Sequence, residues 1–215
     1  MTDQPGILAI WNNVAPGCEA EFETWFQHEH LEERIGVPGF LLGRRHEALS
    51  GTPRFFNFYV TQSPYVLKSA AYLGRLDDPT PMTRRIMSEV FRNMIRTVCR
   101  RTLRLGRMRG TTAITVRLGK GVAGDVLRQT LETMLRDPAV ACGEIWSAVS
   151  PTEFPVSEEE RLRGGDRKIE SCLIVEILRA ESAQPMADML QRRFPSAEVG
   201  VYRVLCEIRP DSSRL

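Results

Sequence analysis

Residues 25–34, WFQHEHLEER, hold two of the three histidines in the chain together with three acids. Three kinds of chemistry fit such a cluster. Histidines and carboxylates bind divalent metals, a carboxylate beside a histidine transfers protons, and charged side chains also mark the solvent end of an amphipathic helix. The spacing of the residues has to decide among these alternatives.

An amphipathic helix is predicted from about Cys18 to Arg34, after a turn at Pro16-Gly17. At about 100° per residue, one stripe of this helix carries Cys18, Phe22, Trp25, Phe26, Glu29 and Glu33, with His30 at its edge. His28 lies on the far side. Residues two apart on a helix do not face each other, and the H-E-x-x-H spacing is absent, so no metal site is predicted.

Glu29 lies on this apolar stripe beside Trp25 and Phe26, where an unpaired carboxylate is costly to bury. It must acquire a partner or change its pKa, and such carboxylates at a cavity edge are candidate acid/base groups. We therefore predict Glu29 and His30 as catalytic proton carriers at a pocket edge, with Trp25 and Phe26 as its wall. In the alternative, both are ordinary helix-end residues, and His30 interacts with the negative helix terminus.

Alternation along the predicted strands adds a substrate-binding set. Side chains that share a strand face are Trp11 with Asn13, Arg44 with His46, and Phe55 with Asn57 and Tyr59. The polar members would donate hydrogen bonds to an oxygenated ligand, while Trp11, Phe55 and Trp146 supply aromatic walls. An exposed hairpin explains Arg44 and His46 equally well.

The order of predicted elements repeats. The first half reads strand 7–14, helix 18–34, strands 40–49 and 54–61, a helix from 63 that breaks at 77–79 and resumes over 81–99, and strand 101–108. The second half reads strand 111–118, helix 124–136, strands 139–149 and 168–178, helix 181–194 and strand 198–208. This order predicts an α+β protein of two tandem ferredoxin-like βαββαβ units, 1–109 with the candidate site and 110–215.

A ferredoxin-like sheet is covered by helices on one face only, so two such sheets bury each other face to face. The expected result is a fused, pseudo-dimeric α/β barrel. Residues 150–166, SPTEFPVSEEERLRGGD, are too polar and too rich in proline and glycine for a strand. They are predicted to form a long hairpin loop or lid, or else a mobile linker.

Composition indicates a folded protein. Hydrophobic content is 42%, charged content 26%, and mean hydropathy −0.23. No apolar run reaches the roughly 20 residues of a membrane span, and residues 1–6 lack the features of a secretory signal. The five cysteines show no C-x-x-C spacing, which favours a reduced, cytoplasmic setting.

The formal net charge of +2 predicts no polyanionic partner. One stretch is locally basic, with nine arginines between Arg84 and Arg109 and Glu89 as its only acid. Because this stretch lacks interleaved aromatic residues, a solvated or subunit-facing surface is expected rather than nucleic-acid binding. Strand edges and this predicted arginine-rich helix leave room for a homodimer.

Residues 11–40 resemble the signature of a known protein family. WNNV followed by EFETWFQHEHLEERIGVPGF resembles the W-[YF]-x-x-E-H-L-x-E-R…P-G-F signature of EthD-like members of the dimeric α/β-barrel superfamily. The match covers about the first 60 residues. The superfamily includes cofactor-free monooxygenases, lactone isomerases, cyclases, dehydratases, haem enzymes and proteins of unknown activity, often encoded beside catabolic genes, so the resemblance implies the fold more than a reaction.

The resemblance also bears on cofactors. Haem-binding members take their axial histidine from the second unit of a fused pair, whereas all three histidines here lie in the first half. The chain also has no G-x-G-x-x-G after a strand, no Walker A motif and no G-x-S-x-G elbow. We therefore expect no cofactor.

The sequence thus predicts a cofactor-independent isomerase, dehydratase or cyclase that transfers protons on a small oxygenated, aromatic or polyketide-like metabolite. A cofactor-free monooxygenase would use the same pocket. A non-catalytic small-molecule-binding or assembly protein, with Glu29 as a structural acid, is the third alternative.

Overall fold

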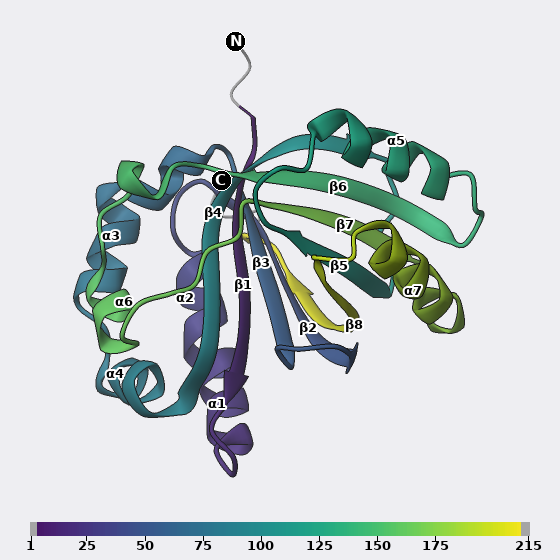
Figure 1. The fold of residues 1–215 in the computed structure, drawn as a ribbon. Helices are drawn as coiled ribbons and strands as arrows, with labels where there is room; N and C mark the ends of the chain where they lie inside the picture. Colours follow the sequence, from purple (N-terminus) through teal and green to yellow (C-terminus); the bar gives the residue numbers. More distant parts are fainter. Residues whose placement is uncertain (1–3, 212–215) are drawn as a thin grey trace.

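Eight antiparallel strands close into one barrel in the order β1-β3-β2-β8-β5-β7-β6-β4 (Figure 1). The structure is a computed structural model that describes residues 4–211. The strands are β1 (Gly6–Val14), β2 (Phe40–Ser50), β3 (Phe55–Thr61), β4 (Phe91–Leu105), β5 (Thr112–Leu118), β6 (Val140–Ala148), β7 (Ser171–Ile177) and β8 (Glu198–Ile208). The expected α+β class and fused barrel are confirmed.

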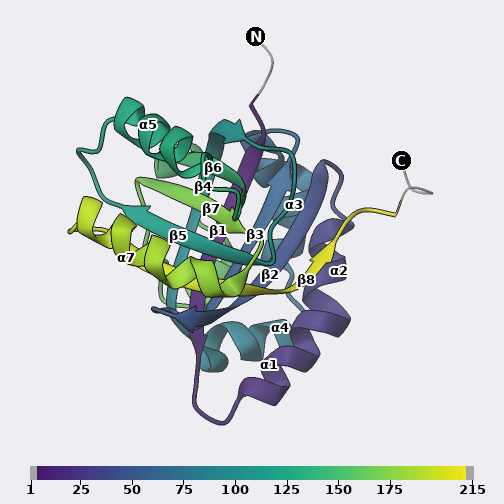
Figure 2. The same cartoon turned by 90° about the vertical axis from the view of Figure 1, so that its right-hand side faces the viewer.

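Helices cover the barrel on two sides (Figures 1 and 2). The α-helices are α1 (Glu19–Trp25), α2 (Leu31–Ile35), α3 (Ala70–Asp77), α4 (Pro81–Arg85), α5 (Gly124–Met134), α6 (Glu158–Leu162) and α7 (Ala183–Arg193). Two π-helical turns are η1 (Phe26–His30) and η3 (Ile86–Val90); the 3₁₀ turns are η2 (Pro64–Lys68), η4 (Pro151–Glu153) and η5 (Ala180–Ser182). None of the helices in the described chain is both long and apolar enough to cross a bilayer.

The two halves of the chain join at two seams of the barrel. At one seam β2 pairs with β8, and at the other β4 pairs with β6. Each of the eight described strands therefore has a neighbour on both sides. The expectation of free strand edges for a partner is wrong, because the seams use those edges.

Three apolar clusters fill the layers that this closure creates. One lies inside the barrel and includes Trp11, Phe56 and Trp146. A second packs the first-half helices on the outer face of their strands, and a third packs α5 and α7 on theirs. Both faces of most strands are thus covered, as in a buried sheet, whereas Arg203 and Leu205 on the second part of β8 are exposed.

The predicted helix over 81–99 is wrong beyond Val90. After α4 and η3 the chain enters β4, a 15-residue strand that pairs with β1 along its first part and with β6 along its last. The arginines of this stretch hide its alternation, because Arg92, Arg96, Arg100, Arg101 and Arg104 are interspersed along the strand that carries inward-facing Ile95 and Cys99. Pairing with two strands stabilises the extended backbone.

Residues 150–166, here called the strap, leave the second half and cross to the helices of the first (Figure 1). The strap carries α6 and contacts α3 and η3. Its two ends are bound to β4: Val149 N donates to Val98 O (2.9 Å), and Arg167 N donates to Met94 O (3.0 Å). The predicted loop is therefore a cover over the first-half helices.

Helix α5 packs so closely on β6 that a side chain at Gly143 has no room. A Cβ atom there would lie 2.0 Å from Leu131 Cδ1 and 3.0 Å from Ile174 O. Gly143→Ala should therefore lower the free energy of unfolding by about 1–3 kcal/mol, measured by urea denaturation. The matched control is Gly74→Ala in α3, where nothing lies within 4 Å; it should be neutral or stabilising by up to about 1 kcal/mol. Equal effects of the two variants would contradict this packing.

Candidate functional site

The predicted helix over 18–34 is present, but it is interrupted by the π-helical turn η1 between α1 and α2. A π-helical turn adds a residue to the turn, so side chains five apart align. The Trp25 and His30 rings lie with their centroids 4.3 Å apart. His30, 7% exposed, is therefore carried onto the buried aromatic face.

Glu29 faces a different neighbour. Its Oε1 accepts hydrogen bonds from Thr80 Oγ1 (2.5 Å) and Thr83 Oγ1 (2.6 Å). Thr83 Oγ1 in turn accepts from Trp25 Nε1 at 2.9 Å. Thr80 also caps α4 through the Thr83 amide. Glu29 thus fastens α4 to η1, and the structure does not bring it into the cavity that His30 lines.

A small cavity of about 30 Å³ lies between the first-half helices and the barrel. We call this cavity the cleft. Its apolar lining comes from residues such as Leu8, Phe26 and Met87, and its polar lining includes His30, Arg34, Tyr59, Arg96, Glu159 and Arg163. The cleft has room for about one or two water molecules.

Different elements supply these polar groups. Arg34 lies on α2, Arg96 on the helix-facing side of β4, and Glu159 and Arg163 come from the strap. Tyr59 lies on β3 opposite Gly43 of β2. A Cβ atom at Gly43 would come within 3.0 Å of the Tyr59 ring, so this glycine leaves space for it.

Three polar atoms at the cleft have no hydrogen-bond partner among the described residues, although each is buried: His30 Nδ1, Arg34 Nη1 and Tyr59 Oη. An unsatisfied buried polar atom costs about 1–3 kcal/mol. Native structures rarely leave such groups unpaired unless water, an ion or a ligand satisfies them. Three such atoms lie around this one cavity, which makes the cleft the candidate site.

Burial and nearby cations set the protonation of the site. Burial, followed by the charges of Arg34, Arg163, Arg45 and Arg96, holds the pKa of His30 well below its usual value. Burial raises the pKa of Tyr59 well above its usual value. At neutral pH the cleft therefore presents a neutral imidazole that accepts a proton and a phenol that donates a hydrogen bond.

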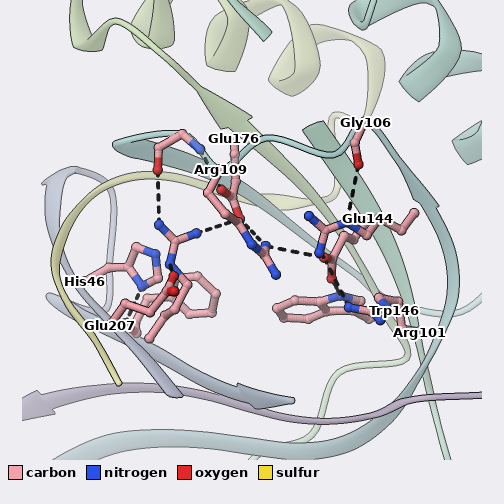
Figure 3. A network of polar contacts seen from close by, with 12 residues as sticks. His46, Arg101, Gly106, Arg109, Glu144, Trp146, Glu176 and Glu207 are labelled. Atoms are coloured by element: carbon pink, nitrogen blue, oxygen red, sulfur yellow. Dashed lines mark hydrogen bonds and ion pairs between the residues drawn. The ribbon is translucent and has the colours of Figure 1, made fainter. Parts of the chain in front are cut away.

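A second polar cluster lies inside the barrel, on the opposite face of the strands (Figure 3). Glu176 binds Arg44 Nη1 (2.8 Å), Arg109 Nη1 (2.5 Å) and the Gly110 amide (2.8 Å). Glu144 binds Arg104 Nη1 (3.1 Å) and Trp146 Nε1 (2.8 Å). These acids and cations pair with one another, which is typical of a structural network, whereas the neighbouring atoms Trp11 Nε1 and His46 Nε2 have no hydrogen-bond partner among the described residues.

The residues of the predicted substrate-binding set do not lie together in the structure, because some are inside the barrel and others are at the cleft or outside the barrel. Trp11 stacks on Phe56 inside the barrel, and His46, whose burial lowers its pKa to about 3, stacks there too. Arg44 and Trp146 belong to the network. These four residues share the barrel interior and do not line the cleft.

The remaining predicted residues lie outside the barrel interior. Tyr59 lines the cleft, and Phe55 packs against Phe22 beneath α1. Asn57 is buried and donates to Asn12 Oδ1 at 3.5 Å, while Asn13 Oδ1 accepts from the Arg54 amide at 2.7 Å. Of the predicted residues, Phe26, His30 and Tyr59 line the cleft, and Trp25 supports it through His30.

Sequence reasoning missed the arginines of the cleft and the strap residues Glu159 and Arg163. Arg34 ends the same WFQHEHLEER stretch, so its proximity to His30 was accessible from helical spacing. Glu159 is 125 residues away from Arg34, and no local pattern connects them.

The corresponding layer of the second half does not fit a haem. It carries no histidine, and aliphatic side chains such as Leu131, Leu173 and Leu190 fill the space between α5, α7 and their strands. Across residues 4–211, no three His, Cys, Asp or Glu side chains group as they would to hold a metal ion.

No protein-family model matches the chain, and no curated protein sequence matches it. Solved structures match over almost the whole chain. A "putative monooxygenase" from Fusobacterium nucleatum subsp. nucleatum is 11% identical with a TM-score of 0.60, covering 97% of this chain and 96% of its own. An anthrone oxidase-like protein is 10% identical with a TM-score of 0.59, covering 96% and 93%.

Chlorite dismutase from Candidatus Nitrospira defluvii, solved with imidazole, is 9% identical with a TM-score of 0.53, covering 94% of this chain and 92% of its own. At these identities the likeness shows the fold alone. The closed antiparallel barrel agrees with the dimeric α+β-barrel type of these neighbours.

The pKa of His30 predicts a pH dependence of stability. Because its pKa is lower in the folded protein than its usual 6.5, protonation favours the unfolded chain. As pH falls below about 6.5, wild type should lose up to about 1.4 kcal/mol per pH unit more than His30→Gln. Urea unfolding between pH 5 and 7.5 measures this difference; parallel curves would show that His30 titrates alike in both states.

The barrel network predicts a second pH dependence. Burial raises the pKa of Glu176, but Arg109, Arg44 and the Gly110 amide more than offset it, so the net shift is downward from 4.5. Glu176→Gln should cost about 3 kcal/mol at pH 7, because buried Arg44 and partly buried Arg109 each lose their shortest ion pair and keep only longer ones, to Glu207 (3.2 Å) and Glu144 (3.4 Å). Exposed Glu132→Gln, with Arg128 3.9 Å away, should cost at most about 1 kcal/mol. The wild-type advantage should shrink as pH falls below about 4.5, where Glu176 becomes protonated.

Proposed function

We propose that the protein is a cofactor-independent enzyme that transfers a proton on a small oxygenated substrate in the cleft. The observation that carries the proposal is the convergence of three buried, unpartnered polar atoms, from His30, Arg34 and Tyr59, on one cavity. A proton-transfer reaction needs a positioned base and donors for a developing oxyanion, and these residues have those properties.

In this proposal neutral His30 removes a proton from a carbon beside a carbonyl group. Tyr59 Oη and the guanidinium groups of Arg34 and Arg96 stabilise the enolate oxygen that forms. Return of the proton to a different atom gives isomerisation, and loss of a β-hydroxyl group as water gives dehydration. Attack of the enolate carbon on a second carbonyl group, whose oxygen then takes up the proton, gives cyclisation. The Trp25 ring holds the imidazole in place, and Glu29 positions Trp25 through Thr83.

A cofactor-free monooxygenase is the second candidate. The same enolate or phenolate would react with O₂, and the names of two structural neighbours, a "putative monooxygenase" and an anthrone oxidase-like protein, favour this chemistry. Both candidates share the first step, which is removal of a proton by His30. That shared step is therefore the one to test.

Hydrogen-deuterium exchange at carbon measures this step. Wild type in D₂O under argon should accelerate exchange at the acidic C–H of 2-tetralone or anthrone, followed by NMR. His30→Gln should lower the enzyme-catalysed rate by about 10²–10⁴-fold. Equal rates in folded wild type and His30→Gln would contradict the proposal and favour a non-catalytic binding protein. In air, O₂ uptake in step with product separates the monooxygenase from the isomerase.

Glu29→Gln is the matched variant for the other predicted proton carrier. If Glu29 positions Trp25, the exchange rate should fall less than tenfold and keep the wild-type pH profile, because the base is unchanged. A loss as large as that of His30→Gln, with an altered pH profile, would identify Glu29 as a proton carrier instead.

A further inference from the structure

One buried ion pair holds the middle of the strap over the cleft. Glu159 on α6 binds Arg34 Nη2, and their side chains are 5% and 2% exposed. The other polar links between α6 and the first half are weak: the Glu158 amide lies 3.4 Å from Asp77 Oδ1, and Arg163 Nη1 contacts the Met87 sulfur. Phe154 and Leu162 of the strap also pack on the first-half core. Among polar contacts, the strap is fixed at its ends and in its middle mainly by the pair of Arg34 and Glu159.

The rest of the strap satisfies its own charges. Arg163 makes two hydrogen bonds to Asp166, at 2.8 and 2.9 Å. Glu160 pairs with Lys168 at 3.0 Å. These pairs would persist if the middle of the strap moved outward, so the electrostatic cost of opening falls on Arg34 and Glu159.

The cleft has more cations than anions on its first-half side. Arg34 has Glu159 as its partner, and Arg96 donates to the Tyr72 hydroxyl oxygen at 2.9 Å. Arg96 has no ion pair among the described residues. A ligand that replaced Glu159 with another negative group would keep Arg34 paired and could also approach Arg96.

Space for such a ligand lies beside the cleft. A cavity of about 210 Å³ under the strap is lined by apolar Val98, Val149 and Phe154 and also by Arg96, which lines the cleft as well. Small-molecule pockets commonly measure about 300–1,000 Å³. Neither cavity reaches that size while the strap is closed, so binding of a whole substrate requires the strap to move.

We propose that the substrate is an anion with an aromatic or apolar body, and that its negative oxygens displace the Glu159 carboxylate from Arg34. Glu159 acts as an internal competitor that keeps the strap closed until such a ligand enters. The apolar body occupies the cavity beneath the strap, and Arg96 contacts the anionic end. This inference rests on the proposed function, because it concerns the ligand of the same cleft.

The test uses benzoate and its neutral analogue benzamide as probes, with affinity measured by calorimetry on the full chain. Glu159→Gln removes the competing charge, so benzoate should bind at least tenfold more tightly than to wild type. Benzamide affinity should not change. Equal benzoate affinity for both proteins, or equal tightening for benzamide, would overturn the inference.

Glu158→Gln is the matched control on the same helix. Glu158 is partly exposed and pairs with exposed Arg161 at 3.4 Å, so this variant should bind benzoate as wild type does. A similar gain in both variants would mean that the overall charge of the strap, and not the pair with Arg34, controls binding. In the Glu159→Gln background, Arg96→Gln should weaken benzoate binding at least tenfold.

Glu159→Gln leaves Arg34 buried without a charged partner, so Glu159→Asp is the second variant for the case in which Glu159→Gln does not fold. Aspartate keeps the charge but is one methylene shorter, so the pair with Arg34 is stretched. Benzoate affinity should then lie between those of wild type and the glutamine variant. An affinity equal to that of wild type would count against the inference.

The outcomes for His30 and Glu159 are independent. If His30→Gln keeps full carbon exchange while Glu159→Gln tightens benzoate, the proposed reaction fails and the anion site stands. If His30→Gln abolishes exchange while Glu159→Gln leaves benzoate affinity unchanged, the reaction stands and the anionic substrate fails.

Discussion

The closed barrel gives its strands an inner face and an outer face, and the rest of the molecule depends on this constraint. Side chains that point inward meet the aromatic interior around Trp11 and Phe56, while those that point outward meet the helices. Because successive side chains along a strand point to opposite faces, two adjacent residues lie in different environments. Phe58 belongs to the interior and Tyr59 to the cleft, although they are adjacent in sequence. Two polar clusters can therefore be built on the same strands without sharing a residue.

The two clusters differ in how completely their charges are compensated. Inside the barrel, Glu144 and Glu176 lie among the arginines that they bind, and buried cations there have carboxylates within ion-pair distance. Such a network stabilises the seam between the halves when complete and is costly when one member is removed. In the cleft, Arg96 donates to the Tyr72 hydroxyl and has no ion pair among the described residues, and three buried polar atoms have no hydrogen-bond partner there. Inside the barrel, Trp11 Nε1 and His46 Nε2 also lack a hydrogen-bond partner, so the two clusters differ mainly in how their arginines are paired.

The π-helical turn η1 connects the helix to this site. Glu29 and His30 are adjacent, yet the turn sends them to different neighbours: Glu29 to the threonines of α4 and His30 to the cavity. A regular helix would have placed Glu29 on the aromatic stripe. Turns of this kind occur frequently at functional sites, where they re-aim one side chain at the cost of regular hydrogen bonding. The strap also contributes to this site. Its residue Glu159, from the second half of the chain, forms the ion pair with Arg34.

The sequence alone determined the order of elements, the two-fold repeat of that order and the barrel, because apolar alternation and turn residues are local signals. It also located the segment that carries His30 and its aromatic neighbours Trp25 and Phe26. It could not locate the end of the helix before β4, since the arginines of that strand mask its alternation until β1 and β6 pair with it. It could not reveal that Glu159 meets Arg34 or that Arg44 and His46 lie across the sheet from His30. Those relations come from the closure of the barrel and the path of the strap, which bring together residues that no local spacing connects.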